Sequence, residues 1–152
     1  MRVWRIVKAR HAAAAYSGEG ARLVGGRWNR AGHPMVYTSL SLALAAMEFF
    51  VHVDPSNAPA PLYSVLAEIP DAIAIERLST ANLPRRWRIP DNEATRKLGA
   101  DWLLSRRTAA LLVPSAAVDG EWNALLNPLH PDFTHIKLAA PRLFRYDAAM
   151  FR

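Results

Sequence analysis

Cysteine is absent from this sequence of 152 residues. The chain therefore has no disulfides, no thiolate nucleophile and no cysteine-ligated metal. An uninterrupted run of eighteen apolar residues is also missing, so no membrane-spanning helix is expected. The first twenty residues, MRVWRIVKARHAAAAYSGEG, carry scattered charges instead of the apolar block of a signal peptide. These absences together predict a small soluble protein of the cytoplasm.

The common catalytic and nucleotide-binding signatures are missing as well. The chain has no GxxxxGK[ST] loop, no strand–GxGxxG–helix unit and no GxSxG serine motif. Its five histidines form neither HExxH nor another pattern of metal ligands. The standard nucleotide folds and serine hydrolases are therefore unsupported, and we expect neither a bound metal nor a resident cofactor.

Lysine is scarce, occurring only at Lys8, Lys97 and Lys137, yet the formal net charge is +6. Arginine therefore carries almost all of the positive charge, and its planar fork can bond two phosphate oxygens at once. Such a chain favours nucleic acid, a phosphorylated small molecule or an acidic partner protein. A solvated, arginine-rich surface without a specific ligand is the alternative.

The length and a hydrophobic content of 51% indicate one folded domain spanning residues 1–152, with a Pro-rich loop at 54–61. Helical patterns occupy Ser41–His52, with Ser39 or Ser41 as N-cap, and Glu93–Arg106, with Asp91 or Asn92 before it. Strand patterns occupy Val3–Val7, Met35–Ser39, Leu62–Ile69, Ala72–Glu76, Ala110–Val113, Ile136–Ala139 and Leu143–Tyr146. Because strands outnumber helices and do not alternate with them, we expect an α+β fold with a mainly antiparallel sheet.

Glu48 is the only acidic residue in the apolar segment SLALAAMEFFVHV, which is predicted to be a buried helix. An unpaired buried carboxylate is costly or takes up a proton. Two interpretations stay open. Glu48 points outward on a solvated face beside Leu44 and His52, or it lines a cleft and serves catalysis or ligand binding.

The stretch GGRWN at 25–29 places two glycines before a guanidinium, an indole and an amide. Glycine permits a sharp turn or a close approach of the backbone to a ligand, so Arg27 is a candidate phosphate clamp. An ordinary turn with an exposed arginine is the alternative. Trp28 faces either that cleft or the core. Tyr37 either packs with its hydroxyl bonded or stacks on a flat ligand ring.

Two further polar positions follow apolar segments. Ser115 ends the segment LLVPS and either donates to a ligand or starts a turn, and it has no His–Asp partners that would make it a nucleophile. In LNPLHPDF, the residues Asn127, His130 and Asp132 are either ligands or turn-formers, with the turn favoured.

Taken in order, these pieces resemble the RES-domain family, the toxin half of bacterial RES–Xre toxin–antitoxin pairs. The arginine, glutamate and serine of the family match Arg27 in GGRWN, Glu48 in AAMEFFVH and Ser115 in LLVPSA. Further matches are WRI at 4–6, YTS at 37–39, LG…DW at 98–102 and NPLHPDF at 127–133. The resemblance runs from Trp4 to about Asp147, and the final YDAAMFR fits less well.

The resemblance implies a compact fold of the diphtheria-toxin-like ADP-ribosyltransferase type. It also implies an enzyme for which NAD⁺ is a substrate, cleaved at the nicotinamide–ribose bond. The acceptor would be water, phosphate or, in some members, a protein side chain. The implied partner is an Xre-like helix-turn-helix antitoxin that blocks the pocket and supplies the contact with DNA. No membrane partner is implied.

The same resemblance assigns roles to residues of this chain. Glu48 would stabilise the oxocarbenium-like state, Arg27 would grip the diphosphate and Tyr37 would stack on nicotinamide. Ser115 would hydrogen-bond the ribose or help to place Glu48. The further residues that would line the NAD⁺ cleft are Gly26, Trp28, Asn29, Asn127 and His130.

Two interpretations compete with an NAD⁺-consuming enzyme. The net charge and the cluster Arg85-Arg86-Trp87-Arg88 are compatible with a toxin that binds or cleaves RNA, although no RNA-recognition motif is present. A catalytically inactive module that only pairs with a partner is the second. The combination of Arg27, Tyr37, Glu48 and Ser115 favours the enzyme over this module.

Overall fold

The computed structural model describes residues 1–54, 56 and 61–151, so the predicted loop at 54–61 lies mostly outside the described residues. The strands are β1 (Arg2–Lys8), β2 (Val36–Ser39), β3 (Leu62–Glu68), β4 (Ile75–Arg77), β5 (Ala110–Pro114), β6 (Trp122–Leu126), β7 (Lys137–Leu138) and β8 (Arg142–Phe144). The α-helices are α1 (Glu19–Val24), α2 (Leu42–Phe50) and α3 (Glu93–Ser105). Short 3-10 helices are η1 (Ala9–Ala14), η2 (Thr80–Asn82), η3 (Pro131–His135) and η4 (Ala148–Phe151).

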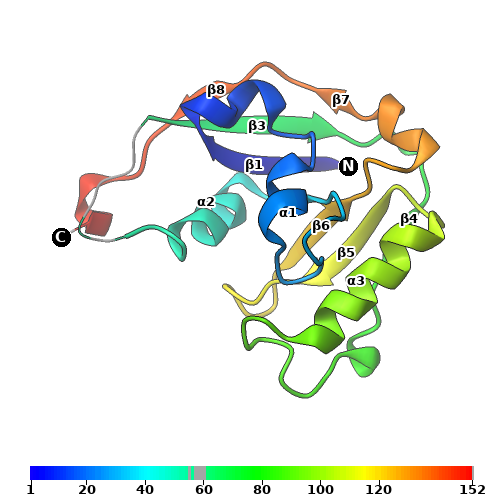
Figure 1. Cartoon of the computed structure of the whole chain (residues 1–152). Coiled ribbons are helices and arrows are strands. Elements are labelled where there is room, and N and C mark those ends of the chain that lie inside the picture. The colour runs from blue at the N-terminus through cyan, green and yellow to red at the C-terminus, as the bar shows by residue number, and fades with distance from the viewer. Residues whose placement is uncertain (55, 57–60, 152) are drawn as a thin grey trace.

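The strands form one sheet in the order β4-β5-β6-β2-β1-β3-β7, and β8 pairs with the remaining part of the β3 edge. Every pair is antiparallel apart from β4 and β5. This confirms the predicted α+β class with a mainly antiparallel sheet. Between β1 and β2 only Trp4 and Ser39 are paired. The sheet changes direction there, and Figure 1 shows β1 and β3 running across the view with β5 and β6 below them.

Both predicted long helices begin at a predicted cap. The Ser41 hydroxyl oxygen accepts from the Leu44 amide at 3.0 Å and so starts α2. The Asn92 side chain accepts from the amides of Ala94 and Thr95 at the start of α3. Strand β6 was not predicted, although it sits near the middle of the sheet.

The expectation that α2 is buried nearly all round is wrong. Within α2 only Leu44 and Ala45 are buried, whereas Leu42 and Met47 are 38% and 37% exposed. The helix lies against β1 with one side, where Ala45 meets Ile6 in a small cluster. An apolar sequence does not report how many neighbours a helix has, and α2 has a sheet on one face only.

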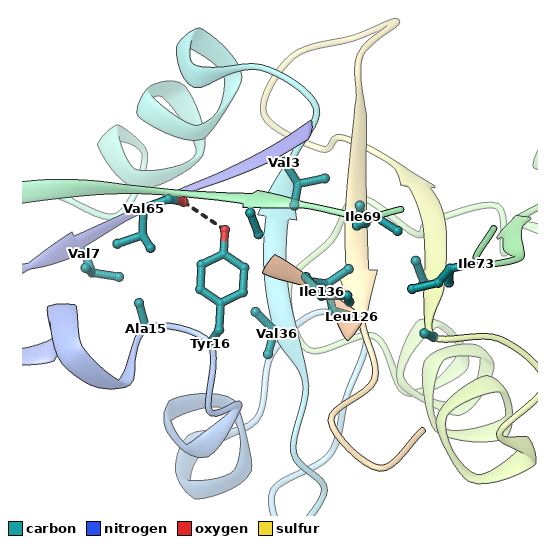
Figure 2. Packing of buried hydrophobic residues seen from close by; sticks show 14 residues of the cluster. Val3, Val7, Ala15, Tyr16, Val36, Val65, Ile69, Ile73, Leu126 and Ile136 are labelled. Carbon is teal, nitrogen blue, oxygen red and sulfur yellow. Dashed lines mark hydrogen bonds between the residues drawn. The ribbon is translucent and has the colours of Figure 1, made fainter. Parts of the chain in front are cut away.

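The two faces of the sheet carry separate hydrophobic clusters because successive strand residues point to opposite sides. On one face, the Tyr16 ring stands among aliphatic side chains and its hydroxyl donates to the Val65 carbonyl at 2.8 Å (Figure 2). On the other face, Trp102 and Leu103 of α3 pack against Leu111 and Leu125. Helix α3 therefore covers β5 and β6 from the second face. No helix among the described residues is long and apolar enough to span a membrane.

Candidate active site

Glu48 points from α2 toward the ends of β5 and β6. Its Oε1 atom accepts a hydrogen bond from the Ser115 hydroxyl at 2.6 Å and another from Asn123 Nδ2 at 2.6 Å. Ser115 follows β5 directly, and Asn123 belongs to β6, which pairs with β5. The carboxylate therefore faces the sheet, and the alternative of an outward-facing Glu48 beside His52 does not describe this structure.

The second carboxylate oxygen of Glu48 is left open. No described residue donates to Oε2. Among the described residues, the buried side-chain polar atoms that lack a hydrogen-bond partner are Arg5 Nε and His33 Nδ1, so Oε2 is not a buried atom. Oε2 is therefore in contact with solvent. A carboxylate with one oxygen anchored and one oxygen open can interact with a ligand without losing its own orientation.

Ser115 serves two purposes in the structure. Its hydroxyl oxygen accepts from the amides of Ala117 at 3.1 Å and Val118 at 3.0 Å, which closes the turn after β5. The same hydroxyl donates a hydrogen bond to Glu48 Oε1. The two interpretations of Ser115 as a turn-former and as a polar donor therefore both describe it.

Asn123 is the residue of this cluster that the sequence did not single out. Its neighbours in β6 are apolar, and the strand follows the turn residues Asp119 and Gly120. An Asp-Gly pair before an apolar run is a hairpin signal. Applied here, it would have placed Asn123 on the same face of the sheet as Leu125, because residues two apart in a strand share a face.

Arg27 fastens the GGRWN turn to a second loop. Its Nη1 atom donates to the carbonyls of Trp87 at 3.0 Å and Arg88 at 2.9 Å. Arg96 reaches the same turn from α3 and donates through Nε to the Gly26 carbonyl at 3.2 Å. Two guanidinium groups therefore converge on the turn, and among the described residues Arg27 forms neither a hydrogen bond nor an ion pair with Glu48.

Tyr37 is tied into the same turn through its hydroxyl. The phenolic oxygen accepts from the Trp28 amide at 3.0 Å and donates to Asn29 Oδ1 at 2.6 Å. Burial raises the pKa of Tyr37 above its ordinary value, so the neutral, donating form is favoured. A Cβ on Gly26 would lie 2.6 Å from this hydroxyl. The second glycine therefore leaves room for Tyr37, where we had expected it to admit a ligand.

Asn29 is fully buried and holds the turn together. Its Nδ2 atom donates to the carbonyls of Ala21, Arg30 and His33 at 2.8, 3.2 and 3.0 Å. Trp28 is also buried, with its ring 6.1 Å from that of Trp87. Of the two interpretations of Trp28, facing a ligand cleft or facing the core, the structure shows the second.

Asn127 and His130 lie in the turn that follows β6. Asn127 is fully buried, donates to the Leu103 carbonyl at 2.9 Å and accepts from the Leu129 amide at 2.9 Å. His130 Nδ1 accepts from the Asp132 amide at 3.0 Å. These bonds join β6 to the end of α3 and shape the turn. They do not bring either side chain to Glu48.

Ser115 also lines a groove of about 440 Å³. The groove runs between the loops at 80–88 and 119–122, and Trp87 and Trp122 belong to its walls. Arg88 lies 4.8 Å from the Trp87 ring centroid and pairs with Asp119 at 2.6 Å. Ser115 is therefore shared between the groove and the Glu48 cluster. No group of His, Asp and Glu side chains in the described part of the chain could hold a metal ion.

Comparison with known proteins identifies the family. A model of the RES domain matches residues 2–147. The chain is 42% identical to the "Prs ADP-ribosylating toxin" of Sphingobium sp. (strain YBL2) over 98% of this chain and 96% of that protein. It is 38% identical to "Toxin Res" of Yersinia enterocolitica, over 97% of each.

A solved structure shares the fold. A chain in the crystal structure of the M. tuberculosis MbcT–MbcA toxin–antitoxin complex matches with a TM-score of 0.73 and 20% identity, over 99% of this chain and 86% of that chain. This match shows that the chain shares the overall fold of that protein. With the family model spanning nearly the whole chain, this protein belongs to the RES-domain toxin family.

Proposed function

We propose that this protein is a toxin that consumes NAD⁺ by breaking its nicotinamide–ribose bond. The observation that carries the proposal is the Glu48 carboxylate, anchored at Oε1 by Ser115 and Asn123 and open at Oε2. An anion held in a fixed position beside an accessible space is suited to stabilising positive charge on a sugar.

The reaction needs such an anion because of how charge moves. When the bond between nicotinamide nitrogen and ribose carbon breaks, its electron pair stays with the nitrogen and nicotinamide leaves as a neutral ring. Positive charge then develops on the ribose, as in other glycosyl transfers. Glu48 stabilises that charge through Oε2. The acceptor oxygen adds to the ribose carbon and releases its proton.

Arg27 and Tyr37 would place the substrate. Arg27 uses Nη1 on the loop carbonyls of Trp87 and Arg88, and its remaining N–H groups would bond the diphosphate. The hydroxyl of Tyr37 is fixed between Trp28 and Asn29, so its ring is held in one orientation. A fixed ring can orient the nicotinamide for departure.

We propose water or phosphate as the acceptor, which makes the protein a glycohydrolase or a phosphorylase. A protein side chain is the second candidate, and the name of the Sphingobium relative favours it. All three acceptors need the same cleavage step at Glu48. They differ only in what reaches the ribose carbon afterwards.

The proposed partner is an antitoxin protein. The solved relative belongs to a toxin–antitoxin complex, which supports a partner of this kind. We further propose an Xre-like helix-turn-helix protein that covers the pocket and contacts DNA for the pair. The net charge of +6 then serves to meet an acidic partner surface.

The RNA alternative has less support in the structure. Within Arg85-Arg86-Trp87-Arg88, the residue Trp87 is only 8% exposed and its ring lies against Trp28. Base stacking needs an accessible aromatic face. Arg88 is also neutralised by Asp119 at 2.6 Å. The cluster therefore presents fewer accessible rings and free charges to a nucleic acid than its sequence indicates.

The test is product analysis after incubation of the purified protein with NAD⁺, with and without phosphate and with and without a cell extract as a protein source. Free nicotinamide is expected in every arm. ADP-ribose marks hydrolysis, ADP-ribose phosphate marks phosphorolysis, and labelled protein marks transfer. Folded, antitoxin-free protein that releases no nicotinamide, but binds RNA in a salt-dependent way, would overturn the proposal.

A further inference from the structure

Asn123 forms a two-bond bridge between β2 and the Glu48 carboxylate. Its Nδ2 atom donates to Glu48 Oε1 at 2.6 Å, and its Oδ1 atom accepts from the Ser39 hydroxyl at 2.7 Å. Ser39 and Asn123 are direct partners in the β2–β6 pairing. The bridge therefore rests on two neighbouring strands rather than on a loop.

The chemistry of the groups fixes which way the amide faces. An ionised carboxylate can only accept hydrogen bonds, so the NH₂ group of Asn123 must face Glu48. Its oxygen then faces Ser39, whose hydroxyl can donate. Ser39 is 3% exposed, so no bulk water replaces it there. Turning the amide over would set its oxygen against the carboxylate oxygen and remove the bond to Glu48.

Glu48 needs this support because its helix is lightly packed. Only Leu44 and Ala45 of α2 are buried. The two donors to Oε1 come from the ends of adjacent strands, Ser115 after β5 and Asn123 in β6. Both act on the same oxygen. They hold the carboxylate in one orientation and leave Oε2 free.

We propose that Asn123, oriented by Ser39, is a positioning residue that directs Oε2 of Glu48 toward the scissile ribose carbon. This inference rests on the proposed NAD⁺ cleavage for its catalytic consequence. The anchoring itself rests only on the contacts of the free protein. Asn123 touches the carboxylate and not the substrate, so its loss should lower kcat while leaving KM nearly unchanged.

The first experiment compares NAD⁺ turnover by the wild type, Asn123→Ala, Asn123→Asp and Ser39→Ala. Asn123→Asp has the same shape and keeps the acceptor for Ser39, but it loses the donor to Glu48. We expect kcat to fall about ten- to a hundredfold in both Asn123 variants, the scale of a misplaced catalytic group. Ser39→Ala should lower kcat about three- to tenfold, the scale of losing one neutral hydrogen bond.

Thr38→Val is the matched control. Thr38 precedes Ser39 in β2 and is 3% exposed, and its hydroxyl donates to the Ala124 carbonyl at 2.7 Å on the other face of the sheet. Its replacement removes a buried hydrogen bond of the same strand without touching Glu48, so kcat should stay near the wild-type value. Equal losses in Thr38→Val and Asn123→Ala would show a merely structural role and overturn the inference. So would an Asn123→Asp variant with wild-type kcat.

The second experiment needs no turnover. Asn123→Asp sets a second carboxylate beside Glu48 and should lower the urea midpoint of unfolding. Adding Glu48→Gln removes the like-charge pair and supplies an NH₂ group that can donate to the new carboxylate, although the Ser115 hydroxyl then loses its acceptor, so the double variant should recover part of that midpoint. It should not recover NAD⁺ cleavage, because the charge is no longer on residue 48.

The two experiments separate two kinds of failure. If the wild type releases no nicotinamide, the proposed reaction fails, while recovery of the midpoint in the exchanged pair still supports the anchoring. If the wild type is active but the exchanged pair is no more stable than Asn123→Asp alone, the amide does not hold the carboxylate. The positioning role of Asn123 is then overturned although the reaction stands.

Discussion

The Ser115 hydroxyl donates a hydrogen bond to Oε1 of Glu48 at a distance of 2.6 Å. A serine hydroxyl has one proton and two lone pairs, and the amides of Ala117 and Val118 occupy the lone-pair side. The turn therefore determines that the hydroxyl hydrogen of Ser115 points toward Glu48. The backbone after β5 thus orients a carboxylate on a helix that is distant in the sequence.

Ser115→Ala should lower NAD⁺ turnover by about ten- to a hundredfold, because it removes a hydrogen bond to a charged group. Ser105→Ala is the control. The Ser105 hydroxyl also accepts from a backbone amide, that of Arg107 at 3.2 Å, but it donates to the Trp102 carbonyl instead of a carboxylate. Steady-state kinetics of both variants checks this, and equal activity in the two would contradict it.

Arg27→Ala should weaken NAD⁺ binding at least about tenfold, since a charge-assisted contact with the diphosphate is lost. It should also release the loop at Trp87 and Arg88, which Arg27 holds through two carbonyls. Calorimetry measures the first effect, and the rate of trypsin cleavage in the loop measures the second. Arg30→Ala, which removes an exposed ion pair with Glu93, is the control. Unchanged NAD⁺ affinity would remove Arg27 from the site.

The free energy of unfolding should fall as pH rises above about 10, the ordinary pKa of tyrosine in an unfolded chain. Burial raises the pKa of Tyr37, so the unfolded chain loses this proton at a pH where the folded protein keeps it. Stability is then fully present below pH 10 and decreases above it, by up to about 1.4 kcal/mol per pH unit for one group. Tyr16 acts in the same direction.

Tyr37→Phe isolates the contribution of one hydroxyl. The variant should be less stable at neutral pH, because the Trp28 amide and Asn29 Oδ1 lose their shared partner. Its stability should also fall less steeply than that of the wild type above pH 10. Urea unfolding of both proteins from pH 8 to 11 gives the two slopes. Identical slopes would show that the Tyr37 hydroxyl ionises as freely in the folded protein as in the unfolded chain.

Gly99→Ala should destabilise the fold by about 3 kcal/mol, at the upper end of the usual cost of overpacking. A Cβ on Gly99 would lie 1.7 Å from the Trp28 carbonyl oxygen, so α3 must move away from the GGRWN turn. Gly20→Ala is a control within α1, where a Cβ would meet nothing within 4 Å. That substitution should raise stability by about 0.5 kcal/mol. Similar midpoints for the two variants would contradict the close contact.

The sequence predicted most elements of the fold because their signals are local. Ser41 and Asn92 both have side chains that can cap a helix, and each does so. Strand β6 was missed because Asn123 near its start interrupts the apolar pattern. The exposure of α2 was missed because the number of neighbours around a helix is a tertiary property.

The candidate site was predicted only where a family pattern supplied the residues. The residues next to Glu48 in the sequence do not predict its contacts with Ser115 and Asn123. Ser115 follows β5 and Asn123 lies in β6, and only the pairing of these strands brings the two side chains together. The role of Gly26 illustrates the converse. Its neighbours in sequence favoured a ligand-binding turn, whereas its neighbour in space is the Tyr37 hydroxyl.

Glu48→Gln tests the central claim most directly, because it keeps the size of the side chain and removes only its charge. The measurement is the rate of nicotinamide release from NAD⁺ by the wild type and by a folded Glu48→Gln protein under identical conditions. The charge-stabilising role of Glu48 predicts a fall of at least about a hundredfold, the scale of losing one key electrostatic stabiliser. Near-wild-type release by Glu48→Gln would contradict it.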